Sequence, residues 1–173
     1  MGISKQGRFA AITNGRKPPV LSGQMCSRGE LPVDFLNSKM SAKQYALEVF
    51  DRSRKFNSFH LLLYDMDSMW YVGSHSESID TSARELAPGI YGLSNAGLDS
   101  TWPKCEIGKD KMSALLAKGN FELSNFLSIV SDRSLAKRSQ LHSLDLYEDR
   151  DHLLSAQFVL AGVYGTRSST ILS

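Results

Sequence analysis

The first segment with residue types suited to chemistry is Leu93-Ser94-Asn95-Ala96, in which Asn95 follows a short apolar run. An asparagine at the end of a buried strand can aim its side-chain amide N–H at a developing oxyanion. The alternative interpretation is that Asn95 forms an Asx turn before Gly97, because asparagine commonly bonds to its own backbone in turns. The residue pattern alone leaves both interpretations open.

The second segment is Tyr164-Gly165-Thr166-Arg167-Ser168-Ser169-Thr170, which places one arginine among small hydroxyl residues. An arginine within a strand is costly to bury without a partner. Its planar guanidinium suits a carboxylate, belonging either to a ligand or to a neighbouring aspartate. The alternative is an edge strand in which the Arg167 side chain lies in solvent.

Other residues carry weaker signals. Asn14 is a third candidate at the end of a predicted strand, although Asn14-Gly15 is also a turn dipeptide. His60 lies in an apolar strand and is typical of a hydrogen-bonded core histidine. Cys26 precedes a candidate helix start, where a thiolate is favoured, but a lone cysteine without a paired histidine is usually structural. No His/Cys cluster has zinc-ligand spacing, so we predict no metal site.

The composition excludes several classes of protein. The 173 residues suffice for one domain with a sizeable core, and 42% hydrophobic with 22% charged residues is ordinary for a globular protein. A net charge of +2 with scattered lysines and arginines gives no basis for nucleic-acid binding. No apolar run approaches the roughly 20 residues of a transmembrane span. Two distant cysteines indicate a reducing compartment, so we predict a cytoplasmic location.

Hydrophobic periodicity and turn residues predict the elements that must position these side chains. We expect helices beginning near Ser27, Ser41 and Trp102 and over 123–130, and strands at 7–14, 59–64, 69–72, 90–93, 156–160 and 163–172. Residues 15–27 and 74–87 are predicted as loop or irregular, and 131–152 as a charged surface segment. Ser27 with Glu30, and Ser41 by itself, have suitable capping side chains.

The order of these elements indicates the fold class. Strand, helices, antiparallel strands, helices and closing strands follow one another, which favours helical layers on largely antiparallel sheets over a doubly wound parallel fold. We therefore predict a mixed α/β (α+β) protein.

Short segments along nearly the whole chain also form an ordered series. They are Gly7-Arg8-Phe9-Ala10-Ala11 with Thr13-Asn14, Ser27-Arg28-Gly29-Glu30-Leu31, Phe56-Asn57-Ser58-Phe59-His60-Leu61-Leu62, Pro88-Gly89-Ile90-Tyr91-Gly92-Leu93-Ser94-Asn95-Ala96, Trp102-Pro103-Lys104 and Tyr164 to Thr170. In this series the chain resembles the Transport and Golgi organisation 2 family, also called the NRDE family. The resemblance implies an N-terminal nucleophile hydrolase-like fold, which is a four-layer αββα sandwich.

The resemblance also implies roles for the residues singled out above. In enzymes with this fold an N-terminal cysteine attacks an amide, and its own α-amino group serves as the base. By position, Asn14 and Asn95 are similar to the oxyanion-side residues, and Arg167 is similar to the active-site arginine. The ligand-binding residues expected on this basis are Ser94, Asn95, Thr166, Arg167 and Ser168.

The chain departs from the family pattern at its start. Family members begin with Met-Cys followed by Asn-Arg-Asp-Glu, and neither motif occurs here. Removal of Met1 would leave Gly2, which has no nucleophile, so whether the protein is an enzyme stays open. We expect truncation at the N-terminus and also at the C-terminus, so that residues 1–173 form a single, partial, incomplete domain.

The family's functions suggest three hypotheses. The resemblance implies roles in secretory and Golgi organisation, in lipid metabolism and in moving haem. Our leading hypothesis is a binding or trafficking protein for a small molecule, namely haem, an acyl compound or an amide, with haem as the candidate carried ligand. The alternative is an N-terminal cysteine amide hydrolase whose nucleophile segment is missing from this chain. The third is a gene fragment, which predicts poor solubility from unpaired sheet edges.

Overall fold

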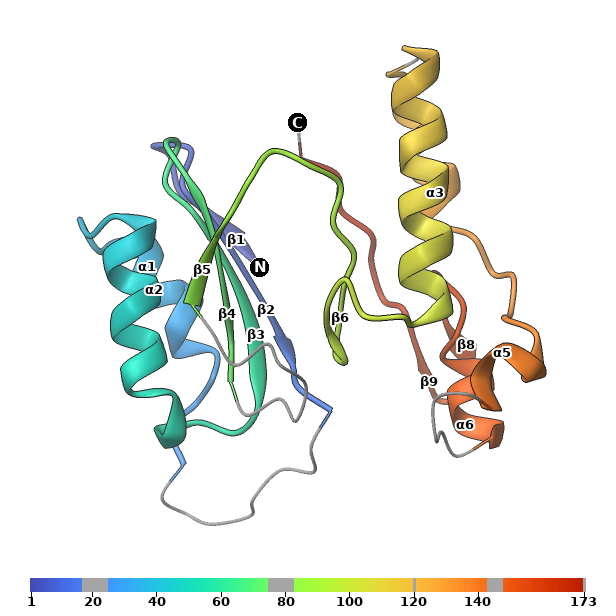
Figure 1. Cartoon of the computed structure of the whole chain (residues 1–173), viewed down its shortest axis with the longest axis horizontal. Helices are drawn as coiled ribbons and strands as arrows, with labels where there is room; N and C mark the ends of the chain where they lie inside the picture. Colours follow the sequence, from blue (N-terminus) through green and yellow to red (C-terminus); the bar gives the residue numbers. More distant parts are fainter. Residues whose placement is uncertain (17–24, 75–82, 120, 143–147, 173) are drawn as a thin grey trace. The chain divides into compact units, whose positions relative to one another are not determined.

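The computed structural model describes residues 1–16, 25–74, 83–119, 121–142 and 148–172. Its contacts divide the chain into two units (Figure 1). Unit 1 is Met1–Gly89 with Leu93–Leu98, and unit 2 is Ile90–Gly92 with Asp99–Ser173. Residues 17–24 and 75–82 of the predicted irregular segments, and residues 143–147 of the charged segment, lie outside the described residues.

An antiparallel five-stranded sheet forms the centre of unit 1. Its strands are β1 (Gly2–Ile3), β2 (Phe9–Asn14), β3 (Phe59–Tyr64), β4 (Met69–Gly73) and β5 (Ala83–Leu86), and they lie in sequence order across the sheet. Three of these strands were predicted. The prediction that 83–86 is irregular was wrong, because β5 pairs with β4 from Met69↔Leu86 to Val72↔Ala83. Arg84 and Glu85 hide the strand in the sequence, because charged residues there do not give the apolar alternation of a strand. Pairing with the apolar strand β4 nevertheless forms β5.

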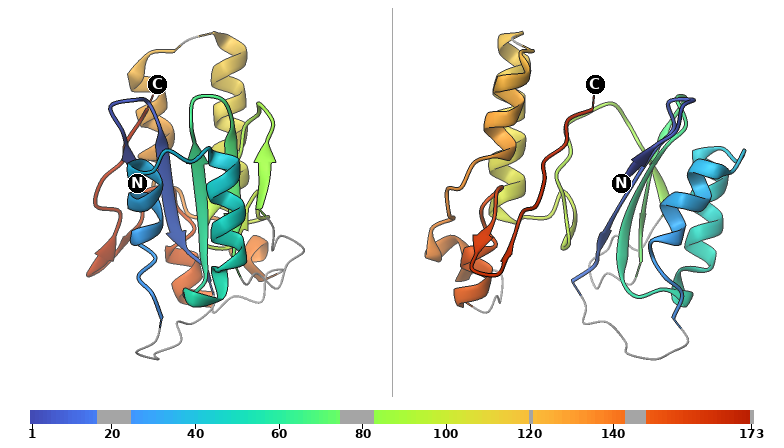
Figure 2. Two further views of the ribbon diagram at one scale, coloured as in Figure 1. Left: turned by 90° about the vertical axis from the view of Figure 1, so that its left-hand side faces the viewer. Right: turned by 180° about the vertical axis from the view of Figure 1, so that it is seen from behind.

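Two helices cover one face of this sheet, as both views in Figure 2 show. They are α1 (Glu30–Asn37) and α2 (Ala42–Asp51), and a 3₁₀ turn at Ser53–Lys55 follows α2. The predicted cap at Ser27 was wrong, because α1 begins only at Glu30 behind Gly29, which makes no side-chain cap. The predicted cap at Ser41 is confirmed, because its hydroxyl accepts a hydrogen bond from Gln44 N at 3.1 Å, completing a capping box.

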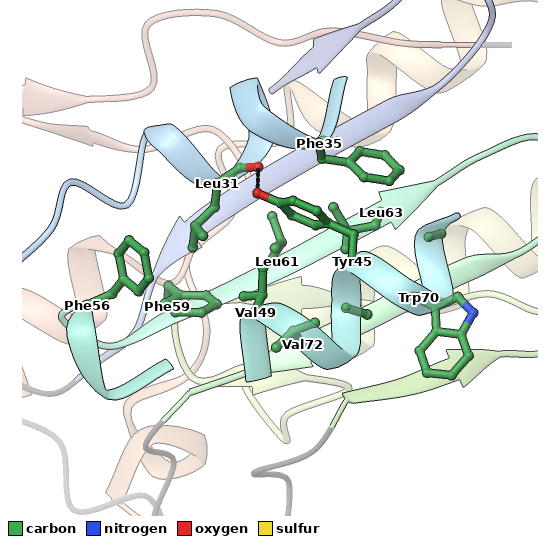
Figure 3. Close-up of a cluster of buried hydrophobic side chains, with 13 residues drawn as sticks. Leu31, Phe35, Tyr45, Val49, Phe56, Phe59, Leu61, Leu63, Trp70 and Val72 are labelled. Carbon is green, nitrogen blue, oxygen red and sulfur yellow. Dashed lines mark hydrogen bonds between the residues drawn. The ribbon is translucent and has the colours of Figure 1, made fainter. Parts of the chain in front are cut away.

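Side chains along β3 point alternately to the two faces of the sheet. Phe59, Leu61 and Leu63 are fully buried against α1 and α2 (Figure 3). Their partners in this core include Leu31, Phe35, Tyr45, Val49, Trp70 and Val72. Successive strand residues point to opposite faces, so the register places His60, Leu62 and Tyr64 on the other face. The polar tip of Tyr45 donates to Leu31 O at 2.8 Å, and burial raises the pKa of Tyr45 to about 12.

The turn between β3 and β4 connects the sheet to α2 through Asp65. Its carboxylate accepts hydrogen bonds from Ala42 N at 2.5 Å, Ser68 N at 2.9 Å and Asp67 N at 3.2 Å. Burial alone would raise the pKa of Asp65, but these N–H donors outweigh it and lower the pKa below its usual value.

We expect Asp65→Ala to lower the free energy of unfolding by about 1–2 kcal/mol, because it leaves the first turn of α2 and the hairpin turn without their acceptor. Urea unfolding at neutral pH measures this loss. The contribution of a carboxylate with a depressed pKa is present above its unfolded value and disappears as the pH falls through the folded value. The difference from wild type should therefore shrink below about pH 4. Asp67→Ala is the control, because that side chain is exposed, and an equal loss in both variants would contradict this role for Asp65.

The short hairpin β6 (Leu93–Ser94) and β7 (Gly97–Leu98) completes unit 1. The predicted strand over 90–93 is therefore shorter and later than expected. Gly92 forms its backbone hydrogen bonds with Asp99 and not with a neighbouring strand. Gly92 N donates to Asp99 Oδ1 at 2.9 Å, and Asp99 N donates to Gly92 O at 2.6 Å.

Unit 2 is mainly helical in its described residues. It contains α3 (Pro103–Lys118), α4 (Leu123–Val130), α5 (Arg138–His142), α6 (Glu148–Leu153), β8 (Leu160–Ala161) and β9 (Tyr164–Gly165). Both predicted helices are confirmed. Gly119 follows the last residue of α3 with a φ of 63°, the left-handed conformation typical of a helix end.

The two long closing strands predicted at 156–160 and 163–172 were wrong. Only two residues pair on each side of the turn, which begins at Gly162. Beyond Gly165 the Thr166 side chain takes over the pairing, because Thr166 Oγ1 accepts from Val159 N while Thr166 N donates to Val159 O, both at 3.0 Å. Because Val159 N donates to the Thr166 hydroxyl and not to a backbone carbonyl, the backbone pairing of the two strands ends here. Residues 166–172 have no strand structure.

The predicted mixed α/β class with antiparallel sheets is confirmed. The four-layer αββα arrangement and the single partial domain stay predictions.

Candidate functional site

The predicted site residues lie in both units. Asn14, Ser94 and Asn95 belong to unit 1, whereas Thr166, Arg167 and Ser168 belong to unit 2. Within unit 1, the clearest polar feature is a set of contacts around the buried side chain of His60.

His60 is 2% exposed and lies in β3 among apolar residues. Its Nδ1 lies 2.8 Å from Tyr71 Oη, and its Nε2 lies 3.3 Å from Asn95 O. The rings of His60 and Tyr71 are nearly parallel, at 9°, and the Arg84 guanidinium lies 5.7 Å from the centre of the Tyr71 ring. A polar chain therefore runs from β5 through β4 and β3 to the β6–β7 hairpin. The prediction of a hydrogen-bonded core histidine is confirmed.

The hairpin itself is a tight turn built on Ser94 and Gly97. These two residues pair directly, and the Ser94 hydroxyl accepts from Ala96 N at 3.0 Å. Gly97 has a φ of 123°, which favours glycine. Ser94 thus supplies the side-chain bond that the Asx-turn alternative assigned to Asn95. Among the hydrogen bonds of the described residues, none uses the Asn95 side chain, which is exposed.

Asn14 lies on the other side of the sheet from this turn. It is exposed at the end of β2, and its register partner is Phe59, whose side chain faces α1 and α2. Thr13 is the register partner of His60. The structure therefore brings Thr13, and not Asn14, to the face that carries the His60–Asn95 contact.

The predicted residues of unit 2 follow β9 as an extended segment. Arg167 and Ser168 are exposed, and no described residue forms a hydrogen bond or an ion pair with the Arg167 guanidinium. The hydroxyl of Thr166 already accepts from Val159 N, so its oxygen has a structural role. Arg167 thus lies in solvent, as the alternative interpretation proposed, although not within a strand.

Sequence reasoning missed that His60 and Tyr71 connect to the Ser94–Asn95 turn. The available signal was the single histidine in the run Phe59–Tyr64, because a polar side chain buried in a strand needs a partner. The partner itself depends on β4 and on a turn 35 positions away, which no local pattern specifies.

The two cysteines are free, Cys26 exposed and Cys105 buried. In the described part of the chain, no group of three or more histidine, cysteine, aspartate or glutamate side chains could hold a metal ion. None of the helices among the described residues has the length and apolar character needed to cross a membrane.

The antiparallel sheet with helices on one face and a hydrogen-bonded turn on the other defines a mixed α/β protein, and the candidate site in unit 1 lies at that turn. The model of the family described as Transport and Golgi organisation 2 matches residues 1–173. The chain therefore belongs to the Transport and Golgi organisation 2 family, as the ordered motifs predicted.

Three relatives carry the same description. The chain is 31% identical to the Transport and Golgi organization protein 2 homolog of Bos taurus, over 99% of this chain and 66% of that protein. It is 36% identical to the Homo sapiens homolog over 63% of this chain and 40% of that protein. It is 29% identical to the Mus musculus homolog over 99% of this chain and 66% of that protein. The chain thus spans about two thirds of the length of the bovine and mouse proteins.

Proposed function

We propose that this protein acts in transport and Golgi organisation, in the cytoplasm, by binding a small amphipathic carboxylate such as haem or a fatty acyl compound. The observation that carries the proposal is the Ser94–Gly97 turn. Its backbone is tied to buried His60, while the Asn95 side-chain amide is exposed and uses no partner among the described residues. Because the backbone of the turn is already ordered, binding a carboxylate through this amide would cost only the ordering of the Asn95 side chain.

The surroundings of the turn fit an amphipathic ligand. By register, the sheet face that carries His60 also carries the partly buried side chains of Ala11, Leu62 and Leu86. Haem and fatty acids each combine an apolar body with a carboxylate. Both would therefore use the apolar sheet face together with the Asn95 side-chain amide as donor. The exposed Arg167 of unit 2 is a separate candidate for carboxylate binding.

We expect Asn95→Ala to weaken carboxylate binding about tenfold, because it removes a hydrogen bond to a charged group. The measurement is a titration of the chain with haem, followed by the Soret band, and in parallel with a fluorescent fatty acid, which distinguishes the two sources of the carboxylate. Lys43→Ala, an exposed residue on α2, is the control. Absence of saturable binding of both probes, or unchanged affinity in Asn95→Ala, would contradict the proposal.

A further inference from the structure

The His60 ring lies directly beneath the Ser94–Gly97 turn. Its Nε2 is 3.3 Å from Asn95 O, and its Cε1 is 3.8 Å from the point where a β-carbon of Gly97 would lie. The ring is therefore hydrogen-bonded to the turn at Asn95, and a side chain at position 97 would meet it at ordinary contact distance.

The two partners of the ring determine which nitrogen carries the proton. A carbonyl oxygen can only accept a hydrogen bond, so His60 Nε2 donates to Asn95 O. In the neutral ring Nδ1 is then the acceptor, and the Tyr71 hydroxyl donates to it at 2.8 Å. Tyr71 is fully buried, which holds its hydroxyl in place. The Asn95 carbonyl thus sets the tautomer of His60, and the Tyr71 hydroxyl stabilises that tautomer by donating to Nδ1.

We propose that His60 is a positioning residue for ligand binding: the Tyr71–His60 pair holds the Asn95 backbone and thereby the place from which the Asn95 side-chain amide reaches a ligand. The link to ligand binding rests on the proposed function, whereas the anchoring of the turn does not. His60 itself is not assigned contact with the ligand, because it is buried and both of its ring nitrogens are engaged.

The test compares two substitutions at this position in the full 173-residue chain. His60→Gln keeps an N–H donor and an oxygen acceptor on neighbouring atoms, whereas His60→Phe keeps a planar ring and removes both. Hydrogen–deuterium exchange of the amides of 93–98 reports the anchoring without any ligand. We expect His60→Phe to accelerate this exchange about tenfold, which corresponds to the loss of one partly buried hydrogen bond. We expect His60→Gln to restore most of the protection, with the β2–β3 amides unchanged in both.

Binding of haem and of the fluorescent fatty acid is then measured on the same variants. We expect the affinity for the bound probe to fall about tenfold in His60→Phe, as in Asn95→Ala, and to recover in His60→Gln. If wild type binds neither probe while His60→Phe still accelerates exchange, the proposed function fails and the anchoring role stands. Unchanged exchange and unchanged affinity in His60→Phe would overturn the positioning role.

A measurement on the wild-type chain decides the case even if His60→Phe does not fold. Long-range ¹H–¹⁵N spectra of the His60 ring distinguish the protonated from the non-protonated nitrogen. We expect a proton on His60 Nε2 and none on His60 Nδ1. Tyr71→Phe should shift the His60 Nδ1 resonance. A ring protonated on Nδ1 alone could not donate to Asn95 O and would overturn the proposal.

Discussion

Replacing Phe35 with alanine is expected to lower the free energy of unfolding by about 3–5 kcal/mol, the usual range for a buried phenylalanine. Phe35 is fully buried in the core between α1 and the sheet. Its ring lies 5.3 Å from that of Tyr45, and the Arg8 guanidinium stacks on it at 4.1 Å from the ring centre. Arg8 also donates to Phe35 O at 3.2 Å and to Met40 O at 2.7 Å, so the cavity would loosen a junction of β2 and α1.

Equilibrium urea unfolding measures this effect. Val33→Ala is the matched control, because Val33 lies on the same helix but is 56% exposed, and it should change stability by about 0.5 kcal/mol or less. Phe35→Leu, which keeps most of the buried volume, should fall between the two. Equal losses in Phe35→Ala and Val33→Ala would show that this face of α1 does not form the core.

Gly15→Ala is expected to cost about 3 kcal/mol, at the upper end of the range for overpacking. A β-carbon at position 15 would overlap the Ser58 hydroxyl and lie 2.7 Å from Ser58 Cβ and 3.0 Å from its backbone carbon. Ser58 has little freedom to move away. Its carbonyl accepts from Gly15 N at 2.7 Å and from Arg28 Nη1 at 2.8 Å, and its hydroxyl donates to Ser74 O at 3.2 Å.

Gly29→Ala is the control for this prediction. A β-carbon there would have Ser27 Oγ as its nearest neighbour, at 3.5 Å, which is an ordinary contact. Thermal unfolding should show a large fall in Tm for Gly15→Ala and little change for Gly29→Ala. A Gly15→Ala variant as stable as wild type would mean that Ser58 moves freely, which the three hydrogen bonds contradict.

The sequence predicted correctly those helices and strands that are determined by residues close together in the chain. The Ser41 capping box, the β3–β4 hairpin and the α3 helix all follow from residues close in sequence. The failures have non-local causes. The β5 strand depends on its pairing with β4, and the early end of the closing hairpin depends on how Thr166 bonds to Val159. Neither partner can be read from a single stretch of sequence.

The candidate site shows the same division. The sequence identified Asn95 as chemically interesting and His60 as a bonded core histidine, and the turn at Ser94–Gly97 connects the two. Nothing in the sequence placed Asn14 on the face away from this turn, because its direction follows from the register of β2 on β3. A shift of one residue in that register would have reversed the assignment.

The most direct test of the proposed site is to follow the Asn95 side-chain amide by NMR during a titration with haem and with a fatty acid. The account predicts that its NH₂ resonances shift saturably with one of these carboxylates, together with the backbone amides of Ser94–Gly97. It also predicts that Asn95→Ala abolishes most of the change at the neighbouring amides. Saturable binding that leaves the Asn95 and Ser94–Gly97 resonances unmoved would place the site elsewhere, and no saturable shift with either ligand would contradict the proposed function.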